Sequence, residues 1–238
     1  MRISFLVLIG LAFGCSQQVE QQERIEIEAT ATGQSFNAAF LIIDGVYNSE
    51  LMAPYDIFQH TIFHTEGGIQ VFTVAPTRDT LTTFEGLKLI PDYGFLTDSI
   101  PDIDILIVPS AEHSMDTDLE NEELITFVKN AGEQADYVMS LCDGAFLLAK
   151  AGLVDGHEST TFPTDITRYR EMYPQLTVHE KVSFVHDHNL ITSAGGAKSY
   201  DPALYLVHLL YGEKVAKGVG KGLVIDWDVN DYEFAIVD

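Results

Sequence analysis

The chain of 238 residues has few cations, few cysteines and no long apolar run, and each shortage excludes a class of protein. Thirteen Lys and Arg stand against 36 Asp and Glu, which gives a formal net charge of −23. So negative a surface repels phosphate backbones, and this argues against nucleic acid as a partner. Two cysteines cannot form a disulfide scaffold, and no apolar run reaches the roughly 20 residues of a bilayer-spanning helix.

What is present fits one globular domain with a solvated acidic surface. Apolar residues make up 46% of the chain, which is enough for one sizeable core. The acidic residues are spread along the chain instead of forming a block, and this pattern is typical of a charged surface that keeps a protein soluble.

The amino terminus has the pattern of a targeting signal. Residues 1–14, MRISFLVLIGLAFG, pair one arginine with a short apolar run, and Cys15 and a polar stretch follow. This resembles the start of a bacterial lipoprotein, although Ala12 and Phe13 depart from the usual residues. The resemblance implies cleavage before Cys15, acylation of that residue, a tether over 15–35, and a periplasmic or outer-membrane location in the cell envelope. Ordinary secretion and a buried structural cysteine are the alternatives.

Apolar patterning predicts alternating strands and helices along the rest of the chain. We expect strands at 38–44, 69–76, 104–110 and 137–142, and hairpins at 80–93 and 182–193. Helices are expected at 49–64 with Ser49 as N-cap, at 119–133, 143–153 and 163–173, and at 201–212 between an Asp201 cap and Gly212.

This alternation predicts the fold class and the domain limits. Strands that alternate with helices form a mostly parallel, doubly wound α/β sheet with helices on both faces. No repeat or linker divides the chain, so we expect a single domain over 36–222. An acidic carboxyl-terminal tail is expected over 223–238.

The sharpest chemical feature is Ser140-Leu141-Cys142-Asp143-Gly144, where a predicted strand runs directly into a predicted helix. A nucleophile at such a turn has small residues on both sides, so that neighbouring chain can pass close to it. Backbone amides at the start of the helix favour a thiolate and can bind an oxyanion. Gly144 is expected to supply one of the amides that bind the oxyanion. The alternative is a small buried cysteine in a core strand.

Four ordered segments resemble the ThiJ/PfpI superfamily, which has a flavodoxin-like, class I glutamine amidotransferase-like fold. The elbow segment SLCDGAFLLAKAGLVDG follows DGVYNSELMAPYDIFQH and DIDILIVPS, and NLITSAGGAKSYDPALYLVHLLYG closes the set. Together these segments cover about residues 38–215. The resemblance implies that Cys142 is the nucleophile and that Glu50 is the carboxyl group that exchanges a proton with it. Glu50 is alternatively a first-turn acid that serves the helix dipole.

The departures from the family pattern concern the proton carrier and the oxyanion loop. Many relatives have histidine directly after the cysteine, where this chain has Asp143, or in a Thr-Thr-His segment, where it has Thr160-Thr161-Phe162. Asp143 is expected either to cap its helix or to orient a substrate amine or water. Ser110-Ala111-Glu112-His113 replaces the family's paired glycines.

We therefore assign further roles around Cys142. Ser110, Ala111 and Gly195 are expected to bind substrate or the oxyanion, and His113 is a substitute proton shuttle whose alternative is an exposed loop residue. No cofactor and no metal are expected. His186-Asp187-His188 lacks a third ligand on its hairpin, and these histidines and His157 are expected to be exposed.

Two functions of different classes follow. The first is a cysteine-dependent hydratase or hydrolase, similar to isonitrile hydratases, that acts on a small carbon–nitrogen or carbonyl substrate. The second is a non-catalytic lipoprotein on the same fold that binds a ligand or senses redox state. The resemblance also makes a homodimer an open alternative, but no apolar stripe identifies an interface.

Overall fold

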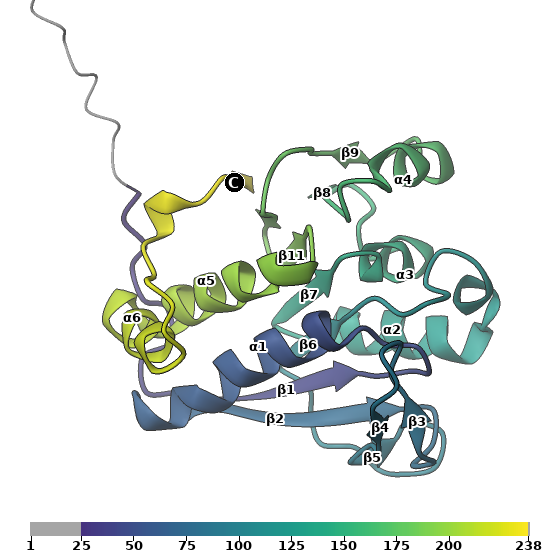
Figure 1. Ribbon diagram of the computed structural model, residues 1–238, viewed down its shortest axis with the longest axis horizontal. Helices are drawn as coiled ribbons and strands as arrows, with labels where there is room; N and C mark the ends of the chain where they lie inside the picture. Colours follow the sequence, from purple (N-terminus) through teal and green to yellow (C-terminus); the bar gives the residue numbers. More distant parts are fainter. Residues whose placement is uncertain (1–24, 238) are drawn as a thin grey trace, which may run out of the picture.

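A computed structural model describes residues 25–237, and its centre is one eight-stranded sheet (Figure 1). The strands of this sheet are β1 (Ser35–Leu41), β2 (Gly68–Ala75), β5 (Tyr93–Gly94), β6 (Ile105–Val108), β7 (Tyr137–Leu141), β10 (Phe184–Asp187), β11 (Leu190–Ser193) and β12 (Phe234–Val237). Their order is β12-β10-β11-β7-β6-β1-β2-β5, and every neighbouring pair is parallel except β10 with β11. The predicted mostly parallel sheet is confirmed.

Within residues 25–237, two small sheets and six α-helices complete the domain. The small sheets pair β3 (Leu81–Thr82) with β4 (Lys88–Leu89) and β8 (Glu158–Ser159) with β9 (Thr177–Val178). The α-helices are α1 (Asn48–His60), α2 (Glu122–Gln134), α3 (Gly144–Lys150), α4 (Ile166–Met172), α5 (Tyr200–Tyr211) and α6 (Glu213–Gly222). Short 3-10 turns are η1 (Thr61–Phe63), η2 (Thr117–Glu120), η3 (Gly196–Ser199) and η4 (Val229–Asp231).

The two faces of the sheet bury two separate apolar cores. One core includes side chains of α1, α5 and α6, and the other includes side chains of α2, α3 and α4. Figure 1 shows the helices that carry them around the central sheet. Along β1, Ala38 and Phe40 belong to the first core, whereas Leu41 belongs to the second. Because both faces are covered, the central strands are continuous apolar runs instead of alternating ones.

The parallel strands bring the predicted site residues to one edge of the sheet. Cys142 follows β7, Ser110 lies shortly after β6, and α1 with Glu50 follows β1. These three strands are neighbours and parallel, so their carboxyl ends open at the same edge. This is the edge at which open α/β sheets bind ligands.

Both chain ends join the domain more closely than the sequence predicts. The amides of Thr30 and Ala31, in the predicted tether, donate to the carbonyls of Leu209 and Leu210 on α5. The predicted acidic tail contains the buried Trp227 and adds β12 to the sheet beside β10. Apolar residues between the acids supply this packing, so the separate tail was wrong. The signal, Cys15 and the tether up to residue 24 lie outside the described residues.

Two predicted helix caps were also wrong. Helix α1 has Tyr47 as N-cap, and Ser49 Oγ donates to the Glu50 carboxylate instead of capping. Helix α5 follows η3, and Asp201 accepts a hydrogen bond from the buried Ser183 hydroxyl. The predicted end of α5 at Gly212, with φ of 89°, is confirmed. In both cases the side chain expected to cap the helix bonds to another side chain instead of to the backbone amides. Ser49 bonds to its neighbour Glu50, and Asp201 bonds to Ser183, which is far away in the sequence.

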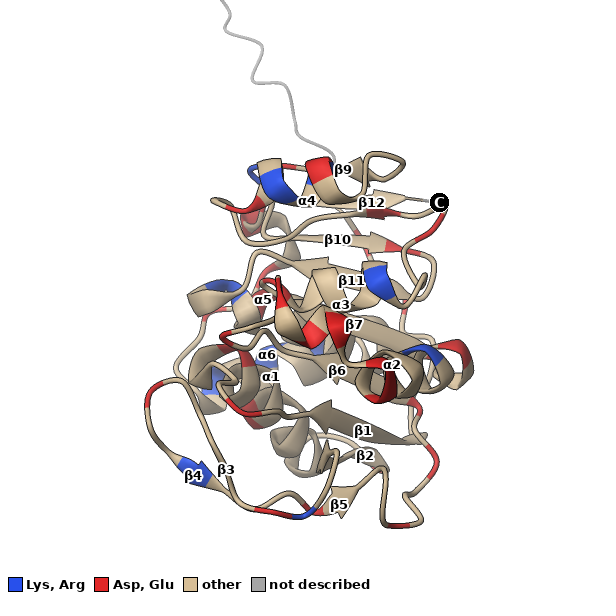
Figure 2. Cartoon of the chain, turned by 90° about the vertical axis from the view of Figure 1, so that its right-hand side faces the viewer, with Lys and Arg blue, Asp and Glu red and all other residues tan. Residues whose placement is uncertain are grey.

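Acidic residues greatly outnumber basic ones, and they are spread over the surface of the domain. Figure 2 shows Asp and Glu around the whole outline of the domain and Lys and Arg at few places. Among residues 25–237, no helix has the length and apolar character needed to cross a membrane.

Candidate active site

Cys142 occupies a tight turn between β7 and α3. Its φ is +56°, a left-handed conformation that is strained for a residue with a side chain. Its amide donates to the Ser193 carbonyl at 3.0 Å, and the residue is 6% exposed. The turn therefore has the geometry of a nucleophile elbow, with a small opening toward solvent.

Two glycines allow the chain to pass close to this elbow. A Cβ on Gly195, whose φ is +75°, would lie 2.3 Å from Cys142 Cβ. A Cβ on Gly144 would lie 2.0 Å from the Val108 carbonyl oxygen at the end of β6. The Gly144 amide donates no hydrogen bond to any residue of the described chain, so it remains available to an oxyanion.

Asp143 contacts the thiol directly. Its Oδ2 lies 3.7 Å from Cys142 Sγ, and its Oδ1 accepts a hydrogen bond of 3.0 Å from the Thr161 hydroxyl. Burial, followed by the charge of Asp165, raises the pKa of Asp143 to about 6. The side chain makes no cap hydrogen bond to α3, so the expected capping role was wrong. Asp143 is instead fixed against sulfur by Thr161.

The environment disfavours a resting thiolate. Burial raises the pKa of Cys142, and the negative charges of Asp143 and Glu50 raise it further. Hydrogen bonds from the Ser110 hydroxyl and the Asp143 amide act in the opposite direction but do not offset these effects. The expectation of a lowered thiol pKa was therefore wrong: the Asp143 amide acts in that direction, but burial and charge outweigh it.

Glu50 lies buried in the first turn of α1, with 4% exposure. Its Oε1 accepts from the Gly196 amide at 2.9 Å, and its Oε2 accepts from Ser49 Oγ at 2.9 Å. These bonds fix the carboxyl group between α1 and the Gly195-Gly196 turn, which itself touches Cys142. The structure thus brings Glu50 and Cys142 into one site, as the sequence predicts.

The loop after β6 contributes less than expected. Ser110 is fully buried, and its hydroxyl has no hydrogen-bond partner other than the thiol within the described part of the chain. The Ala111 amide donates to Ser114 Oγ at 2.8 Å, so it is not free for an oxyanion as predicted. His113 is exposed and forms an ion pair of 3.2 Å with Asp116, away from the thiol.

Tyr47 is a site residue that the sequence did not reveal. It precedes α1, its amide donates to the Ser110 carbonyl at 3.1 Å, and its ring lies 4.6 Å from that of Phe84. Burial raises the pKa of its hydroxyl, and the charges of Cys142, Glu112 and other groups of the site raise it further. A tyrosine beside a predicted cap was the available signal, but only the fold shows that it borders the thiol.

The predicted exposure of the histidines is correct in part. His188 is exposed and His157 is partly buried, but His186 is buried and its Nδ1 lies 2.7 Å from the Tyr205 hydroxyl. The prediction for His186 was wrong because its ring packs against Tyr205 of α5, with ring centroids 5.3 Å apart. Within residues 25–237, one group of side chains could hold a metal ion, and it joins His157, Asp187 and His188.

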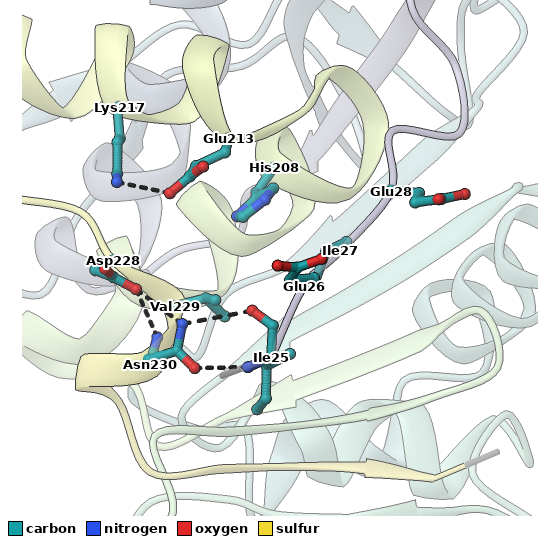
Figure 3. Close-up of a pocket in the computed structure, with 10 residues that line it drawn as sticks. All are labelled: Ile25, Glu26, Ile27, Glu28, His208, Glu213, Lys217, Asp228, Val229 and Asn230. Carbon is teal, nitrogen blue, oxygen red and sulfur yellow. Dashed lines mark hydrogen bonds and ion pairs between the residues drawn. The ribbon is translucent and has the colours of Figure 1, made fainter. Parts of the chain in front are cut away.

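A cavity of about 570 Å³ lies away from the elbow. It is bordered by the segment at Ile25, by α5 and α6 at His208 and Glu213, and by the carboxyl-terminal segment at Asn230 (Figure 3). His208 is 4% exposed and accepts a hydrogen bond from Trp227 Nε1, so its ring is part of the packed core. None of the residues around this cavity belongs to the elbow.

Comparison with known proteins agrees with this geometry. The family model described as DJ-1/PfpI family matches residues 37–209. The chain belongs to the DJ-1/PfpI family. It is 30% identical over 179 residues to an isonitrile hydratase of Pseudomonas putida, with 75% of this chain and 73% of that protein covered.

Other relatives include a transcriptional regulator and a protein of known structure. The chain is 26% identical over 145 residues to the HTH-type transcriptional regulator GbdR of Pseudomonas aeruginosa, covering 60% of this chain and 37% of the regulator. A solved ThiJ/PfpI family protein from Pseudomonas syringae has the same fold, with a TM-score of 0.71, 24% identity, and coverage of 82% of this chain and 76% of that one. This DJ-1/PfpI domain is thus similar both to an enzyme and to part of a regulator.

Proposed function

We propose that this DJ-1/PfpI protein is a cysteine-dependent hydratase or hydrolase of small carbon–nitrogen or carbonyl substrates, with isonitriles as the first class to test. One contact supports the proposal most: Asp143 Oδ2 lies 3.7 Å from Cys142 Sγ. A carboxyl group with a pKa near 6 can both take and return a proton near neutral pH. The similarity to an isonitrile hydratase supports the same reading.

The reaction with an isonitrile, R–N≡C, balances with water as the other reactant. Sulfur of Cys142 adds to the terminal carbon, while the thiol proton passes to Asp143 and then to that carbon, which forms R–N=CH–S–Cys. Water adds across the carbon–nitrogen double bond, with its oxygen on the carbon and one of its protons on nitrogen. The carbon–sulfur bond then breaks, the second proton of water passes to sulfur, and the carbon–oxygen double bond forms. The product is the formamide R–NH–CHO. Because the thiol pKa is raised, proton loss accompanies attack instead of preceding it.

The remaining residues hold this arrangement. The free Gly144 amide lies at the elbow, where it can donate to developing negative charge. Thr161 orients Asp143, and Glu50, fixed by Gly196, supplies a second carboxyl group for the water step. The 6% exposure of Cys142 restricts access, which favours small substrates.

The test combines turnover with thiol chemistry. Purified wild-type protein is incubated with alkyl and aryl isonitriles, and formamide is measured beside the variants Cys142→Ser, Asp143→Asn and Glu50→Gln. We expect formamide from the wild type, none from Cys142→Ser and a loss of at least 100-fold from Asp143→Asn. Turnover that survives Cys142→Ser would overturn the cysteine mechanism.

A second function is favoured by the raised pKa of the thiol. A buried, protonated thiol suits a protein that binds a ligand without turnover, and a relative of this chain is a transcriptional regulator. Redox sensing is disfavoured, because sensor cysteines are accessible and have a low pKa. In that case no substrate of either class is converted, yet a bound ligand raises the melting temperature of wild type and Cys142→Ser equally. The two functions therefore give different results in the same set of assays.

A further inference from the structure

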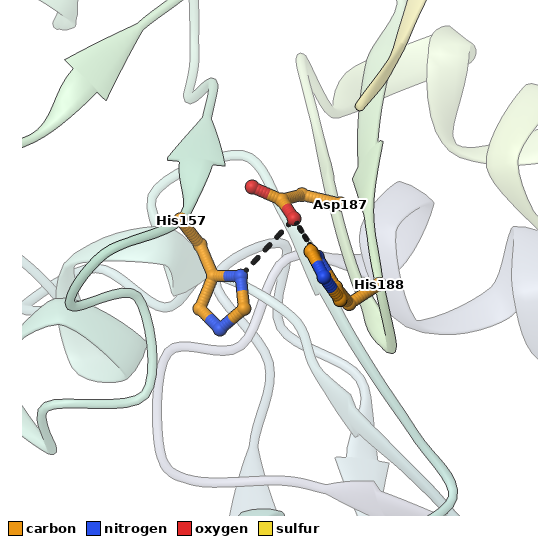
Figure 4. Close-up of side chains that lie close together, drawn as sticks. All are labelled: His157, Asp187 and His188. Atoms are coloured by element: carbon orange, nitrogen blue, oxygen red, sulfur yellow. Dashed lines mark hydrogen bonds and ion pairs between the residues drawn. The ribbon is translucent and has the colours of Figure 1, made fainter. Parts of the chain in front are cut away.

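The turn that precedes β8 and the β10–β11 hairpin bring three metal-ligating side chains together (Figure 4). His157 precedes β8, Asp187 ends β10, and His188 begins the hairpin turn. One ligand atom from each residue lies within 4.8 Å of the other two. The hairpin by itself supplies two of these ligands, and the fold supplies the third from a distant part of the chain.

One carboxylate oxygen of Asp187 is fixed by a backbone hydrogen bond, and the other contacts both histidines. Its Oδ2 accepts a hydrogen bond of 2.6 Å from the Glu158 amide, which fixes the plane of the carboxyl group. Its Oδ1 faces Nδ1 of His157 at 3.2 Å and also contacts Nδ1 of His188. Asp187 is 2% exposed, so this oxygen is held in a defined place. A ligand whose orientation is fixed by a hydrogen bond from its other atom is typical of metal sites.

His157 is not satisfied by Asp187 alone. Its Nδ1 is buried and has no hydrogen-bond partner within residues 25–237, although Asp187 Oδ1 lies 3.2 Å away. Its contact with Asp187 is an ion pair to an oxygen that His188 also contacts, so the nitrogen is incompletely hydrogen-bonded, which costs free energy. A cation between the two imidazoles and the carboxylate would satisfy this nitrogen and would replace the two ion pairs that share a single oxygen.

We propose that His157, Asp187 and His188 bind a divalent metal ion of the zinc class. Two imidazole nitrogens and one carboxylate oxygen are donors that Zn²⁺ accepts, at about 2.0–2.2 Å after small side-chain movements. Three protein ligands leave a fourth position for water or another ligand. The side chain of His188 is 65% exposed, which gives the ion a path from solvent.

This site is separate from the thiol site. Leu190, directly after the hairpin turn, pairs with Val138 near the start of β7, whereas Cys142 follows the end of β7. The metal site thus lies at the opposite edge of the sheet from the elbow. A bound metal ion would link the turn after α3 to the β10–β11 hairpin. Because the ion would bind only the folded protein, it would stabilise the folded state. Its test is independent of the proposed reaction at Cys142.

Zinc and cobalt are the probes. Full-length protein, purified without a histidine tag and treated with a chelator, is titrated with Zn²⁺ by calorimetry and with Co²⁺ by visible absorption. We expect one ion per chain, cobalt bands of low coordination number, and a rise in melting temperature that EDTA reverses. His157→Ala and His188→Asn are expected to weaken zinc binding at least tenfold.

His188→Asn is the main variant because it preserves the backbone. His188 has φ of +58°, which asparagine tolerates well, and the residue is exposed. The matched control is His113→Ala, since His113 Nδ1 also lies 3.2 Å from an aspartate, Asp116, but without a second imidazole. Melting of each variant without metal shows that it folds. Absence of stoichiometric binding in the wild type, or equal affinity in wild type and His188→Asn, overturns the proposal.

Discussion

At the scale of single residues, Asp143 decides the acid–base character of the site. It stands where many relatives have histidine, and it introduces a carboxyl group next to sulfur where a cation would favour the thiolate. The result is a thiol with a raised pKa and a carboxyl group with a pKa of about 6. At neutral pH the proton therefore rests on sulfur, and the Asp143 carboxylate beside it is the group that can accept it, a role that an imidazole would otherwise have.

Asp143 gives stability a distinctive dependence on pH. Its folded pKa of about 6 exceeds the ordinary value of 3.8, so the folded state binds the proton more tightly than the unfolded state. This contribution is fully present below about pH 4 and is lost as the pH rises through about 6, with a total of about 3 kcal/mol. The Asp143→Asn variant is expected to lack this contribution of residue 143 to the pH dependence of the free energy of unfolding. Urea unfolding of both proteins from pH 4 to pH 8 measures it, and parallel curves would contradict the assignment.

The same variant changes the reactivity of the thiol. Asparagine is isosteric with Asp143 but uncharged, so the thiolate of Cys142 loses a repulsive neighbour. We expect alkylation by iodoacetamide at pH 8 to accelerate about tenfold, the effect of one pKa unit. Glu50→Gln is expected to act in the same direction but less strongly. Slower alkylation in Asp143→Asn would show that the carboxylate promotes proton loss in the resting protein.

Gly195 tests how tightly the elbow is packed. An alanine methyl group there would lie 2.3 Å from Cys142 Cβ at a φ of +75°, so backbone must move. We expect Gly195→Ala to cost about 3 kcal/mol or more of folding stability and to abolish turnover. Gly86→Ala is the control, because φ is +94° but no atom lies within 4 Å of the added Cβ. That control is expected to cost about 1 kcal/mol. Equal losses in urea unfolding would mean that contact with Cys142 is unimportant.

At the scale of elements, the carboxyl-terminal strand is part of the core architecture. Strand β12 pairs with β10, and Phe234 stacks on Phe184 with ring centroids 4.7 Å apart. Because β12 lies beyond β10, the backbone of β10 is not left as the outer edge of the sheet. The acidic residues between positions 226 and 233 hide this role in the sequence.

Two substitutions within β12 separate the effect of lost packing from the effect of shortening any side chain of the strand. Phe234→Ala removes the stacked ring and is expected to lower folding stability by about 1–3 kcal/mol. Ile236→Ala in the same strand removes a side chain that is 44% exposed and is expected to cost less than 1 kcal/mol. Chemical unfolding compares the two variants. A larger loss from Ile236→Ala would indicate that this face of the strand is covered in solution.

At the scale of the whole molecule, the charge and the amino-terminal pattern point to an anchored acidic domain. The net charge of −23 opposes contact with anionic membrane surfaces, so a stable membrane location requires a covalent anchor. We propose that Cys15, which lies outside the described residues, carries this anchor in the cell envelope.

A homodimer also stays a prediction, which the mass of the purified protein in solution tests.

Lipidation is tested in cells. Full-length protein is expected to incorporate an alkynyl fatty acid and to fractionate with membranes, whereas Cys15→Ser is expected to lose both properties. Cys142→Ser is the matched control, because it removes the other cysteine of the chain and should leave labelling intact. Labelling that persists in Cys15→Ser would place the modification elsewhere.

Much of the fold follows from local patterning that the sequence carries openly. Apolar runs and turn residues predict the central strands, both hairpins and five of the α-helices, because a strand buried on both faces must be apolar throughout. Helix α6 and strands β8, β9 and β12 of the described chain were not predicted. The elbow around Cys142 and the paired Glu50 are also predicted, since their motifs stand in the order that the family resemblance requires. Proximity was harder to predict: Tyr47 borders the thiol, and the Ala111 amide is occupied by Ser114.

The sequence by itself determined the fold class, the acidic surface, the elbow and the residue types of its site. Only the tertiary structure decided the protonation of Cys142 and Asp143, the inclusion of β12 and the meeting of His157 with Asp187 and His188. The physical reason is that burial and charge–charge interaction depend on distances between residues far apart in the chain. Local propensity and periodicity do not contain those distances.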